Sequence, residues 1–485
     1  MTIPTVPVAI VGGGPAGLAA AIEVAQTGLR CMLIDESPQL GGQIYRQIPN
    51  AFEVLNAQAF GVDYAEGRSL LDAFSQVQHL IELRTGTTVL GIWNGHEILW
   101  ATDLHSGKLY AEQIILATGA YERPVPFPGW TLPGVMAAGG VGVLVKTQRV
   151  RPGDRAIVAG VGPLLLATAV LLHSIGVEIA AVLDASEAPW LRDEPWEPAD
   201  EHRWIANARQ HAAILRAAGV PLLANHSIFE AHGLDRVDRV VYGPVDPTTW
   251  KPQHEQAVIT NVDLVALRFG FIPNIELSVV AGCCHVYEPQ FESWVPVRDP
   301  FMRTTQSGMF SVGDGAGIGG VLMALDEGRV AGITAAEQAG KLDAETASKK
   351  REEPLQRLQS LFMLRQRLDE VSRIRPGLNA LLTPDTLVCR CEEVYCQEVD
   401  NAIAQGACDL QAVKLLSRIG MGSCQGRQCR PSMAMYLSET LGRTPEQVGL
   451  INPRAPVKPV TLGALARMEG VASPSAHSDA SKQKS

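Results

Sequence analysis

The chain has 485 residues, enough for about three domains at the usual size of roughly 150 residues each. Hydrophobic residues make up 46% of the sequence and charged residues 19%, a composition that excludes disorder over most of the length. Asp and Glu outnumber Lys and Arg by 51 to 41, and only 6% of the residues are aromatic. These values argue against a nucleic-acid partner, which would need a basic surface.

The termini and the cysteines bound the class of protein further. The sequence reaches a glycine-rich motif at Gly12 without the cationic and apolar regions of a signal peptide, so we expect a cytoplasmic protein. The most apolar stretch, Val161 to Leu183, is interrupted by Pro163 and Glu178, so we expect no membrane span. Four of the nine cysteines crowd into a short C-terminal stretch, which favours a metal or cluster site over disulfides.

The first predicted elements form a strand, turn, helix and strand. Apolar strands cover Val8 to Val11 and Cys31 to Ile34, and a helix runs from about Pro15 to Thr27. The turn fits GxGxxG, which binds a dinucleotide pyrophosphate at a helix N-terminus. Asp35 ends the second strand, where a carboxylate can accept hydrogen bonds from ribose hydroxyls, and Glu36 is the weaker substitute. A tight turn without a ligand is the alternative. The predicted nucleotide-binding residues are Gly12, Gly14, Pro15, Ala16, Gly17, Asp35 and Glu36.

Three further motifs agree with a nucleotide site. They are Gly41-Gly42-Gln43, Ala117-Thr118-Gly119-Ala120 and the segment from Gly308 to Asp314. With these motifs the chain resembles the two-dinucleotide-binding-domain flavoproteins of the glutathione reductase and thioredoxin reductase superfamily. The resemblance implies bound FAD, with Asp314 on its ribityl chain and the positive end of a helix from about Gly320 facing the flavin. The predicted FAD-binding residues then also include Gly42, Gln43, Thr118, Gly119 and Asp314.

The chain lacks the redox cysteine pair of the disulfide reductases in that superfamily. Gln43 follows the second Gly-Gly where a cysteine would be expected, and Cys283 and Cys284 are adjacent, a spacing typical of buried spectators. Thiol-disulfide chemistry is therefore disfavoured. His285 beside Cys284 is interpreted as structural, and no catalytic residue is assigned.

A second unit of the same kind follows. A strand at Ala156 to Ala159 leads through Gly160 and Gly162 into a helix that runs through Leu172, and a strand at Ile179 to Leu183 ends at Asp184. The third glycine position holds Leu165, which would keep the helix farther from the strand. Gly160, Gly162 and Asp184 are predicted to bind a second adenine nucleotide, NAD or ATP. A purely structural domain is the equal alternative, and a 2′-phosphate is disfavoured.

The remaining pattern completes a predicted α/β fold with two Rossmann-like domains and a small helical C-terminal domain. The other predicted elements are strands at Lys108–Tyr110, Gln113–Leu116, Val220–Leu223, Val237–Tyr242 and Val262–Leu267, a helix at His202–Ala218, and a helix that continues beyond Gly328 to about Ala339. The predicted domains are an FAD-binding domain at 1–125 and 263–341, a second dinucleotide-binding-like domain at 126–262, a helical linker at 342–383, a cysteine-bearing domain at 384–449, and a tail at 450–485 that is disordered after about 470.

The C-terminal cysteines form the pattern C-x-C, 32 residues, then C-x4-C. The predicted ligands are Cys389, Cys391, Cys424 and Cys429, and four thiolates fit either Zn²⁺ or a [2Fe-2S] cluster. Arg390, Arg427 and Arg430 would offset the negative charge of a cluster. Cys396 and Cys408 are expected on flanking helices as core thiols. The segment resembles the bacterioferritin-associated ferredoxin-like [2Fe-2S] domain, although its C-x4-C spacing is longer.

Taken together, the motifs in this order resemble the A or alpha subunits of bacterial FAD-dependent amine dehydrogenase complexes, of the opine oxidase, D-hydroxyproline dehydrogenase and hydrogen cyanide synthase type. The residues that carry the resemblance include the run from Ala117 to Pro124, the run from Pro128 to Met136 and Cys389-Arg390-Cys391. The resemblance implies a partner, an amine-oxidising FAD-dependent beta subunit, and in some complexes a small ferredoxin-like subunit. The expected function is electron transfer from that partner to an external acceptor. A stand-alone NADH-dependent reductase with its own cluster is the alternative.

Overall fold

The computed structural model describes residues 4–48, 62–93, 96–192, 196 and 203–468, and it confirms the mixed α/β class. The predicted disorder after about residue 470 lies outside the described residues. Within the part of the chain that is described, no helix is long and apolar enough to cross a membrane.

The first sheet has the order β3-β2-β1-β6-β5-β4, with β19 paired to the free part of β6. Five of its strands are parallel, β1 (Thr5–Val11), β2 (Cys31–Ile34), β3 (Ile81–Arg84), β6 (Ser106–Leu116) and β19 (Met309–Ser311), and β4 (Thr88–Trp93) and β5 (Glu97–Ala101) form an antiparallel extension. The two strands predicted at Lys108–Tyr110 and Gln113–Leu116 are one continuous strand, β6. That prediction was wrong because β6 serves two partners, pairing with β5 in its first half and with β19 in its second.

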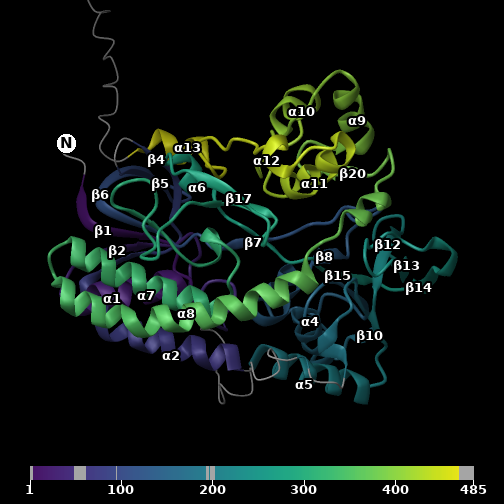
Figure 1. Cartoon of the computed structure of the whole chain (residues 1–485), viewed down its shortest axis with the longest axis horizontal. Helices are drawn as coiled ribbons and strands as arrows, with labels where there is room; N and C mark the ends of the chain where they lie inside the picture. Colours follow the sequence, from purple (N-terminus) through teal and green to yellow (C-terminus); the bar gives the residue numbers. More distant parts are fainter. Residues whose placement is uncertain (1–3, 49–61, 94–95, 193–195, 197–202, 469–485) are drawn as a thin grey trace, which may run out of the picture.

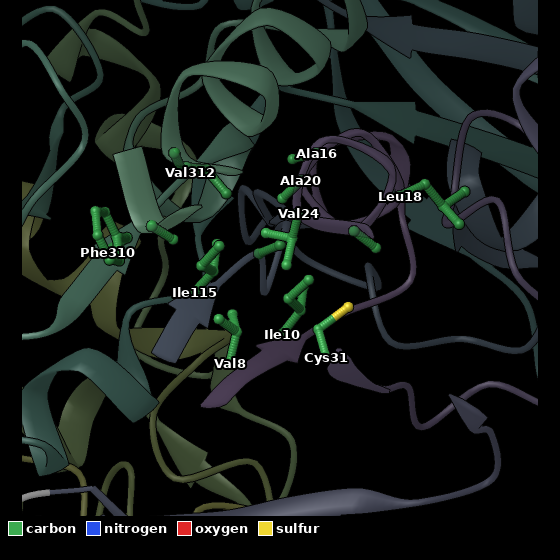
Figure 2. Packing of buried hydrophobic residues seen from close by; sticks show 14 of the residues in the cluster. Val8, Ile10, Ala16, Leu18, Ala20, Val24, Cys31, Ile115, Phe310 and Val312 are labelled. Carbon is green, nitrogen blue, oxygen red and sulfur yellow. The ribbon is translucent and has the colours of Figure 1, made fainter. Parts of the chain in front are cut away.

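Helices cover one face of this sheet, as Figure 1 shows. They are α1 (Pro15–Gln26), α2 (Val62–Val77), α7 (Val321–Gln338) and α8 (Ala344–Ser372). Small residues let α1 and α7 approach closely, since a Cβ on Gly328 would stand 2.1 Å from the Ala16 carbonyl oxygen. Figure 2 shows the core beneath them, in which Ala20 and Val24 of α1 face Ile10 and Ile115 of the sheet.

The second sheet repeats the parallel design in the order β11-β10-β9-β15-β8. Its strands are β8 (Val135–Ala137), β9 (Arg155–Gly160), β10 (Glu178–Asp184), β11 (Leu222–Ala224) and β15 (Leu264–Arg268). Its helices are α3 (Ala138–Gly142), α4 (Leu164–Ser174) and α5 (Arg203–Ala217), and β12 (His226–His232), β13 (Arg239–Pro244) and β14 (Val258–Asn261) form an antiparallel sheet beside it. Both predicted βαβ units are therefore confirmed as local structure.

Short elements connect the two sheets. They are β7 (Ala120–Glu122) paired with β16 (Phe271–Pro273), α6 (Glu276–Val280), and β17 (His285–Glu288) paired with β18 (Ser293–Pro296). Single turns occur at η2 (Gln78–Leu80), η3 (Val143–Thr147), η4 (Pro189–Leu191), η6 (His254–Gln256), η7 (Gly313–Ala316) and η8 (Pro376–Leu381). The long helix α8, green in Figure 1, packs along α7 and ends at the second sheet.

The cysteine-bearing unit lies at one end of the molecule, in yellow-green in Figure 1. It contains β20 (Leu387–Cys389), β21 (Val394–Tyr395), α9 (Cys396–Ala404), α10 (Leu410–Ser417), α11 (Cys429–Leu441) and α12 (Pro445–Val448), and α13 (Leu462–Ala466) follows it. Cys408 lies in the loop between α9 and α10, which corrects the prediction that it is helical. After this unit the chain returns to the first sheet, where the Val457 N–H donates to the Leu90 carbonyl at 2.8 Å.

Candidate functional site

Four predicted segments meet at one edge of the first sheet. The strands β2, β1, β6 and β19 are neighbours and run in the same direction, so their carboxyl ends share an edge. Asp35 follows β2, Gly12 follows β1, Thr118 follows β6 and Asp314 follows β19. Ligands of open parallel sheets bind at this edge. The structure therefore brings together residues that are up to 302 positions apart in the chain.

The glycines of the first turn are demanded by backbone contacts. A Cβ on Gly12, whose φ is +110°, would stand 2.2 Å from the Ala117 carbonyl oxygen, and one on Gly17 would stand 1.8 Å from the Gly12 carbonyl oxygen. By contrast, a Cβ on Gly14 would meet only the Gly42 Cα, at 3.7 Å, which is an ordinary van der Waals distance. Backbone atoms therefore pack closely against Gly12 and Gly17, while the space beside Gly14 is open. That space lies at the N-terminus of α1, where a phosphate would be stabilised.

The second Gly-Gly motif supports this turn from the side. The Gly41 N–H donates to the Gly13 carbonyl at 2.9 Å, and a Cβ on Gly42 would stand 2.9 Å from the Gly14 Cα. Gln43 is exposed and accepts a hydrogen bond from the Arg46 guanidinium. Pro15 and Ala16 are the first residues of α1, and Ala16 is buried against α7.

Asp35 and Glu36 differ in their surroundings. Asp35 is 9% exposed and accepts hydrogen bonds from the N–H groups of Gly13 and, at 2.6 Å, Ser37. Burial raises its pKa, although both hydrogen bonds oppose that effect. Glu36 lies at the surface and forms an ion pair with Lys458. Asp35, and not Glu36, is therefore the carboxylate that contacts the glycine turn.

Asp314 occupies the other end of the edge. Its Oδ1 accepts hydrogen bonds from the N–H groups of Gly319 and Gly320 at 3.0 and 2.9 Å, directly before α7, which leaves Oδ2 for another donor. Burial raises the pKa of this carboxyl. The Thr118 hydroxyl donates to the Asn274 carbonyl at 2.6 Å and would stand 2.5 Å from a Cβ on Gly315. Two motifs are thus locked together where β6 and β19 end.

A cavity of about 270 Å³ opens beside the loop that follows Asp314. Its walls combine apolar side chains, among them Phe291 and Phe362, with the guanidinium groups of Arg298 and Arg365. Arg298 is itself paired with Glu327 at 2.6 Å. The cavity extends the candidate site from the sheet edge toward α8.

The second glycine turn has a different environment. Gly160 and Gly162 are buried, whereas Gly12 and Gly14 are half-buried. A Cβ on Gly162 would meet the Ser372 hydroxyl, at the end of α8, at 3.6 Å. Leu165 is 1% exposed and packs in the core between α4 and the second sheet. The end of α8 therefore lies in contact with this turn, and both of its glycines are buried.

Asp184 is closed off in the same way. It is 2% exposed and accepts hydrogen bonds from the N–H and the hydroxyl of Ser186, at 2.9 and 2.7 Å, and from the Gly162 N–H at 3.3 Å. Burial raises its pKa to about 6, while hydrogen bonds from Ser186, Gly162 and Trp190 oppose the rise. A carboxylate has about four acceptor positions, so these three hydrogen bonds occupy most of the acceptor capacity of Asp184.

The four predicted ligand cysteines are brought together. Cys429 interacts with Cys389 and with Cys424, and Cys424 interacts with Cys391. The interaction with Cys429, together with the backbone N–H groups of Gly420, Glu392 and Cys391, lowers the pKa of the Cys389 thiol to about 6. Among the residues that the structure describes, no three His, Cys, Asp or Glu side chains are grouped closely enough to hold a single ion.

Glycine shapes the second loop of this unit. A Cβ on Gly422 would stand 2.3 Å from the Cβ of Cys391, so a side chain there would push the two loops apart. The N–H groups of Gly426 and Gln428 interact with the Cys424 sulfur. Cys396 is buried in the core of the unit, as predicted.

The adjacent cysteines Cys283 and Cys284 and the histidine that follows them differ in their burial. Cys283 is buried, but Cys284 is exposed, which corrects the expectation that both are buried. His285 is held by the Ser278 hydroxyl and the Cys283 carbonyl, both at 2.8 Å, and burial lowers its pKa to about 4. It is therefore neutral and structural.

Sequence reasoning missed the residues that join the cysteine unit to the sheets. The Arg427 guanidinium carbon lies 5.6 Å from the centre of the Tyr121 ring, and Arg427 and Arg430 both pair with Glu276 of α6. The Trp130 indole N–H donates to the Leu387 carbonyl at 2.6 Å. These contacts span well over a hundred residues of sequence, and no local signal marks them.

Two family models match the chain. Residues 6–344 match the pyridine nucleotide-disulphide oxidoreductase family, and residues 383–468 match the sarcosine oxidase A3 domain. The HcnB subunit of hydrogen cyanide synthase from Pseudomonas protegens is 32% identical over 463 residues, which cover 94% of this chain and 96% of that protein. The A subunit of opine oxidase from Agrobacterium tumefaciens is 33% identical over 480 residues, which cover 95% and 91%.

A more distant relative and two solved structures extend the picture. The alpha subunit of sarcosine oxidase from Corynebacterium sp. is 24% identical over 95% of this chain but only 45% of its own length. L-proline dehydrogenase from P. horikoshii superposes with a TM-score of 0.68 at 22% identity, over 96% of this chain and 81% of the other. T. acidophilum thioredoxin reductase gives 0.50 at 20% identity, over 69% and 99%. The two structural matches concern the fold alone.

Proposed function

Because the chain belongs to the pyridine nucleotide-disulphide oxidoreductase family, and within it to the group of the hydrogen cyanide synthase HcnB and opine oxidase A subunits, we propose that it is an electron-transferring subunit of a dehydrogenase complex for amines or amino acids. The chain is a flavoprotein oxidoreductase. In the proposal it holds FAD and a [2Fe-2S] cluster and passes electrons from a partner to an external acceptor. The substrate is of the opine, D-hydroxyproline or glycine type.

The observation that carries the proposal is the short connection between the nucleotide edge and the cysteine loops. Thr118 and Gly119 lead directly into β7, where the Tyr121 ring lies under the guanidinium of Arg427. Arg427 in turn donates to the Cys424 carbonyl at 3.1 Å. Two side chains therefore separate the two regions, and such proximity favours electron transfer within this chain.

The residues of the first edge fit FAD. The space in front of Gly14 admits a pyrophosphate, Asp35 retains acceptor capacity for a ribose, and Oδ2 of Asp314 is available at the opposite end. Bound FAD would supply two-electron chemistry. The chain's own residues would orient the cofactor: the backbone N–H groups at the start of α1 would stabilise its phosphates, and the positive end of α7 would stabilise negative charge on the flavin.

The cysteine unit fits a two-iron cluster. In a [2Fe-2S] centre each iron takes two thiolates, so four cysteines that interact with one another supply the number of ligands that such a centre needs. Such a centre would supply one-electron chemistry. Cys389, Cys391, Cys424 and Cys429 are the residues that would hold it, and backbone N–H groups at their sulfurs would stabilise the negative charge.

The second turn is less accessible to NADH or another adenine nucleotide than the first turn. Asp184 is 2% exposed and already accepts three hydrogen bonds, and Gly160 and Gly162 are buried. No electron step is therefore assigned to this domain. This disfavours the stand-alone NADH-dependent reductase, the competing function.

The partners follow from the relatives, which are named as subunits of larger enzymes. We expect an amine-oxidising FAD-dependent beta subunit to oxidise the C–N bond of the substrate. A small ferredoxin-like subunit is the second expected partner.

Three measurements test the proposed function. Co-expression with an amine-oxidising flavoprotein partner should give amine oxidation that the purified chain alone lacks, and the chain should contain iron and acid-labile sulfide with a reducible EPR signal. Anaerobic mixing with NADH should leave the flavin absorbance unchanged. Amine oxidation by the isolated chain at the rate of the complex would overturn the proposal, as would rapid bleaching by NADH.

A further inference from the structure

A buried acidic side chain lies between two arginines that flank the predicted cysteine ligands. Glu276, the first residue of α6, is fully buried. Its carboxylate oxygens lie 3.6 Å from Nε of Arg427 and 3.3 Å from Nη1 of Arg430, whose side chains are also buried. Arg427 lies between Cys424 and Cys429 in the sequence, and Arg430 directly follows Cys429. The three charges thus join the FAD-binding sheet to the cysteine loops.

This cluster is not explained by stability. Among the described residues, neither oxygen of Glu276 has a hydrogen-bond partner, and the facing nitrogens of the two arginines have none either. Buried ion pairs without good hydrogen bonds recover little of their desolvation cost. Packed apolar side chains would hold α6 and the cysteine loops together at least as well, so the charges call for another explanation.

The charges of Glu276, Arg427 and Arg430 add up to a net positive charge in a buried position. Two guanidinium groups and one carboxylate leave one positive charge beside the cysteine pairs, and burial keeps water and salt from screening it. Arg427 also donates to the carbonyls of Cys424 and Val457, so its orientation depends on these backbone acceptors together with Glu276. His285, which interacts with Arg430 and Glu276, is neutral near pH 7 and adds no charge.

We propose that Glu276 is a positioning residue that holds Arg427 and Arg430 at the cysteine loops and sets the reduction potential of the cluster. This inference rests on the proposed function. Reduction adds a negative charge to the cluster, which the arginines favour and Glu276 disfavours. The carboxylate therefore keeps the potential lower than the two arginines alone would make it, and so keeps the cluster able to pass its electron onward.

The test is an EPR-monitored redox titration of the full chain and of two variants with opposite changes of charge. Glu276→Gln should move the cluster potential in the positive direction, by a tenfold or greater change in the reduction equilibrium, about 59 mV for a one-electron couple. Arg430→Gln should move it in the negative direction. Glu276→Asp, which keeps the charge, should restore a potential close to that of the wild type.

A matched control is available on the other side of the cysteine pairs. Glu392 follows Cys391 and pairs with Arg418 at 2.7 Å, but the Arg418 side chain is 70% exposed. Solvent screens this pair, so Glu392→Gln should shift the potential less than Glu276→Gln does.

The outcomes separate this inference from the proposed function. Wild-type protein without iron and labile sulfide would contradict the proposed function, and the inference with it. Wild-type protein with the cluster, but with shifts of the same sign in Glu276→Gln and Arg430→Gln, would indicate loosened packing and overturn the inference alone. If Glu276→Gln does not fold, the sign of the shift in Arg430→Gln decides, because an unchanged or more positive potential there is incompatible with the proposal.

Discussion

The two glycine turns of this protein are built by the same strand, helix and strand, and yet only the first remains open. Gly12 and Gly14 are half-buried, while Gly160 and Gly162 are buried, with Ser372 of α8 in contact with the Gly162 position. Asp35 is 9% exposed and accepts two hydrogen bonds, from Gly13 and Ser37, whereas Asp184 is 2% exposed and accepts three. A dinucleotide fold is thus not evidence of a dinucleotide site, because a few contacts decide whether the turn can admit a ligand.

The largest expected effect comes from a substitution at the third glycine position of the first turn. Gly17 is replaced there by leucine, the residue that the second turn has at the same position, Leu165. In Gly17→Leu the new Cβ would overlap the Gly12 carbonyl oxygen at 1.8 Å, so α1 must move away from the sheet. We expect loss of bound FAD and destabilisation of at least about 4 kcal/mol. Absorbance at flavin wavelengths after purification measures the first effect, and chemical denaturation the second.

The matched change in the second turn should leave the flavin in place. Leu165→Ala removes a buried side chain and should cost about 2–5 kcal/mol of stability, with the FAD content of the wild type. A yellow Gly17→Leu protein, or a colourless Leu165→Ala protein that is still folded, would remove the distinction between the two turns.

A second comparison concerns the carboxylates. Asp314→Ala removes a carboxylate of which only Oδ1 is used by Gly319 and Gly320, and because hydrogen bonds to charged groups contribute about 1.5–3 kcal/mol, FAD should bind about 10- to 100-fold more weakly. Asp184→Ala should leave the dissociation constant of FAD unchanged. Titration of the apoprotein with FAD, followed by flavin fluorescence, gives both constants, and equal losses in the two variants would show that the two carboxylates act alike.

The third expected effect is a dependence of the unfolding free energy on pH, which arises from Asp184 at the second turn. The folded-state pKa of Asp184 is about 6, above its ordinary value of 3.8, so the folded state binds the proton more tightly. The stability that this group contributes is fully present below pH 3.8 and is lost as the pH rises through about 6. On the order of 3 kcal/mol is at stake for a shift of this size.

Urea denaturation at several pH values measures this effect. The difference in unfolding free energy between the wild type and Asp184→Asn should change between about pH 4 and pH 6 and be constant above about pH 7. A difference that does not vary with pH would mean that Asp184 is not buried as described.

The smallest effect concerns the surface beside the first turn. Lys458→Ala breaks the ion pair with Glu36, whose side chain is 51% exposed, so the loss of stability should be at most about 1 kcal/mol and should vanish at high salt. Retention of FAD should be unaffected. Loss of the cofactor in this variant would show that Glu36, and not Asp35, carries the ribose contact.

Local patterns in the sequence predicted the parallel units and the order of the motifs, because an apolar strand, a glycine turn and a helix are neighbours in the chain. They failed where the outcome depends on distant partners. The sequence predicts two strands where β6 is one, because β6 pairs with β5 and then with β19, and the contact of Gly162 with Ser372 joins positions 210 residues apart. Glu276 carries no signal, since its role depends on two arginines in another unit.

The most direct measurement is a count of the electrons that the isolated full chain accepts. Anaerobic titration with dithionite, followed by absorbance and EPR, should take up about three electrons per chain, two in the flavin and one in the cluster. The second turn should contribute none, and added NADH should not substitute for dithionite. Uptake of two electrons without an EPR signal from iron, or rapid reduction by NADH, would contradict the proposal that this chain is an electron relay.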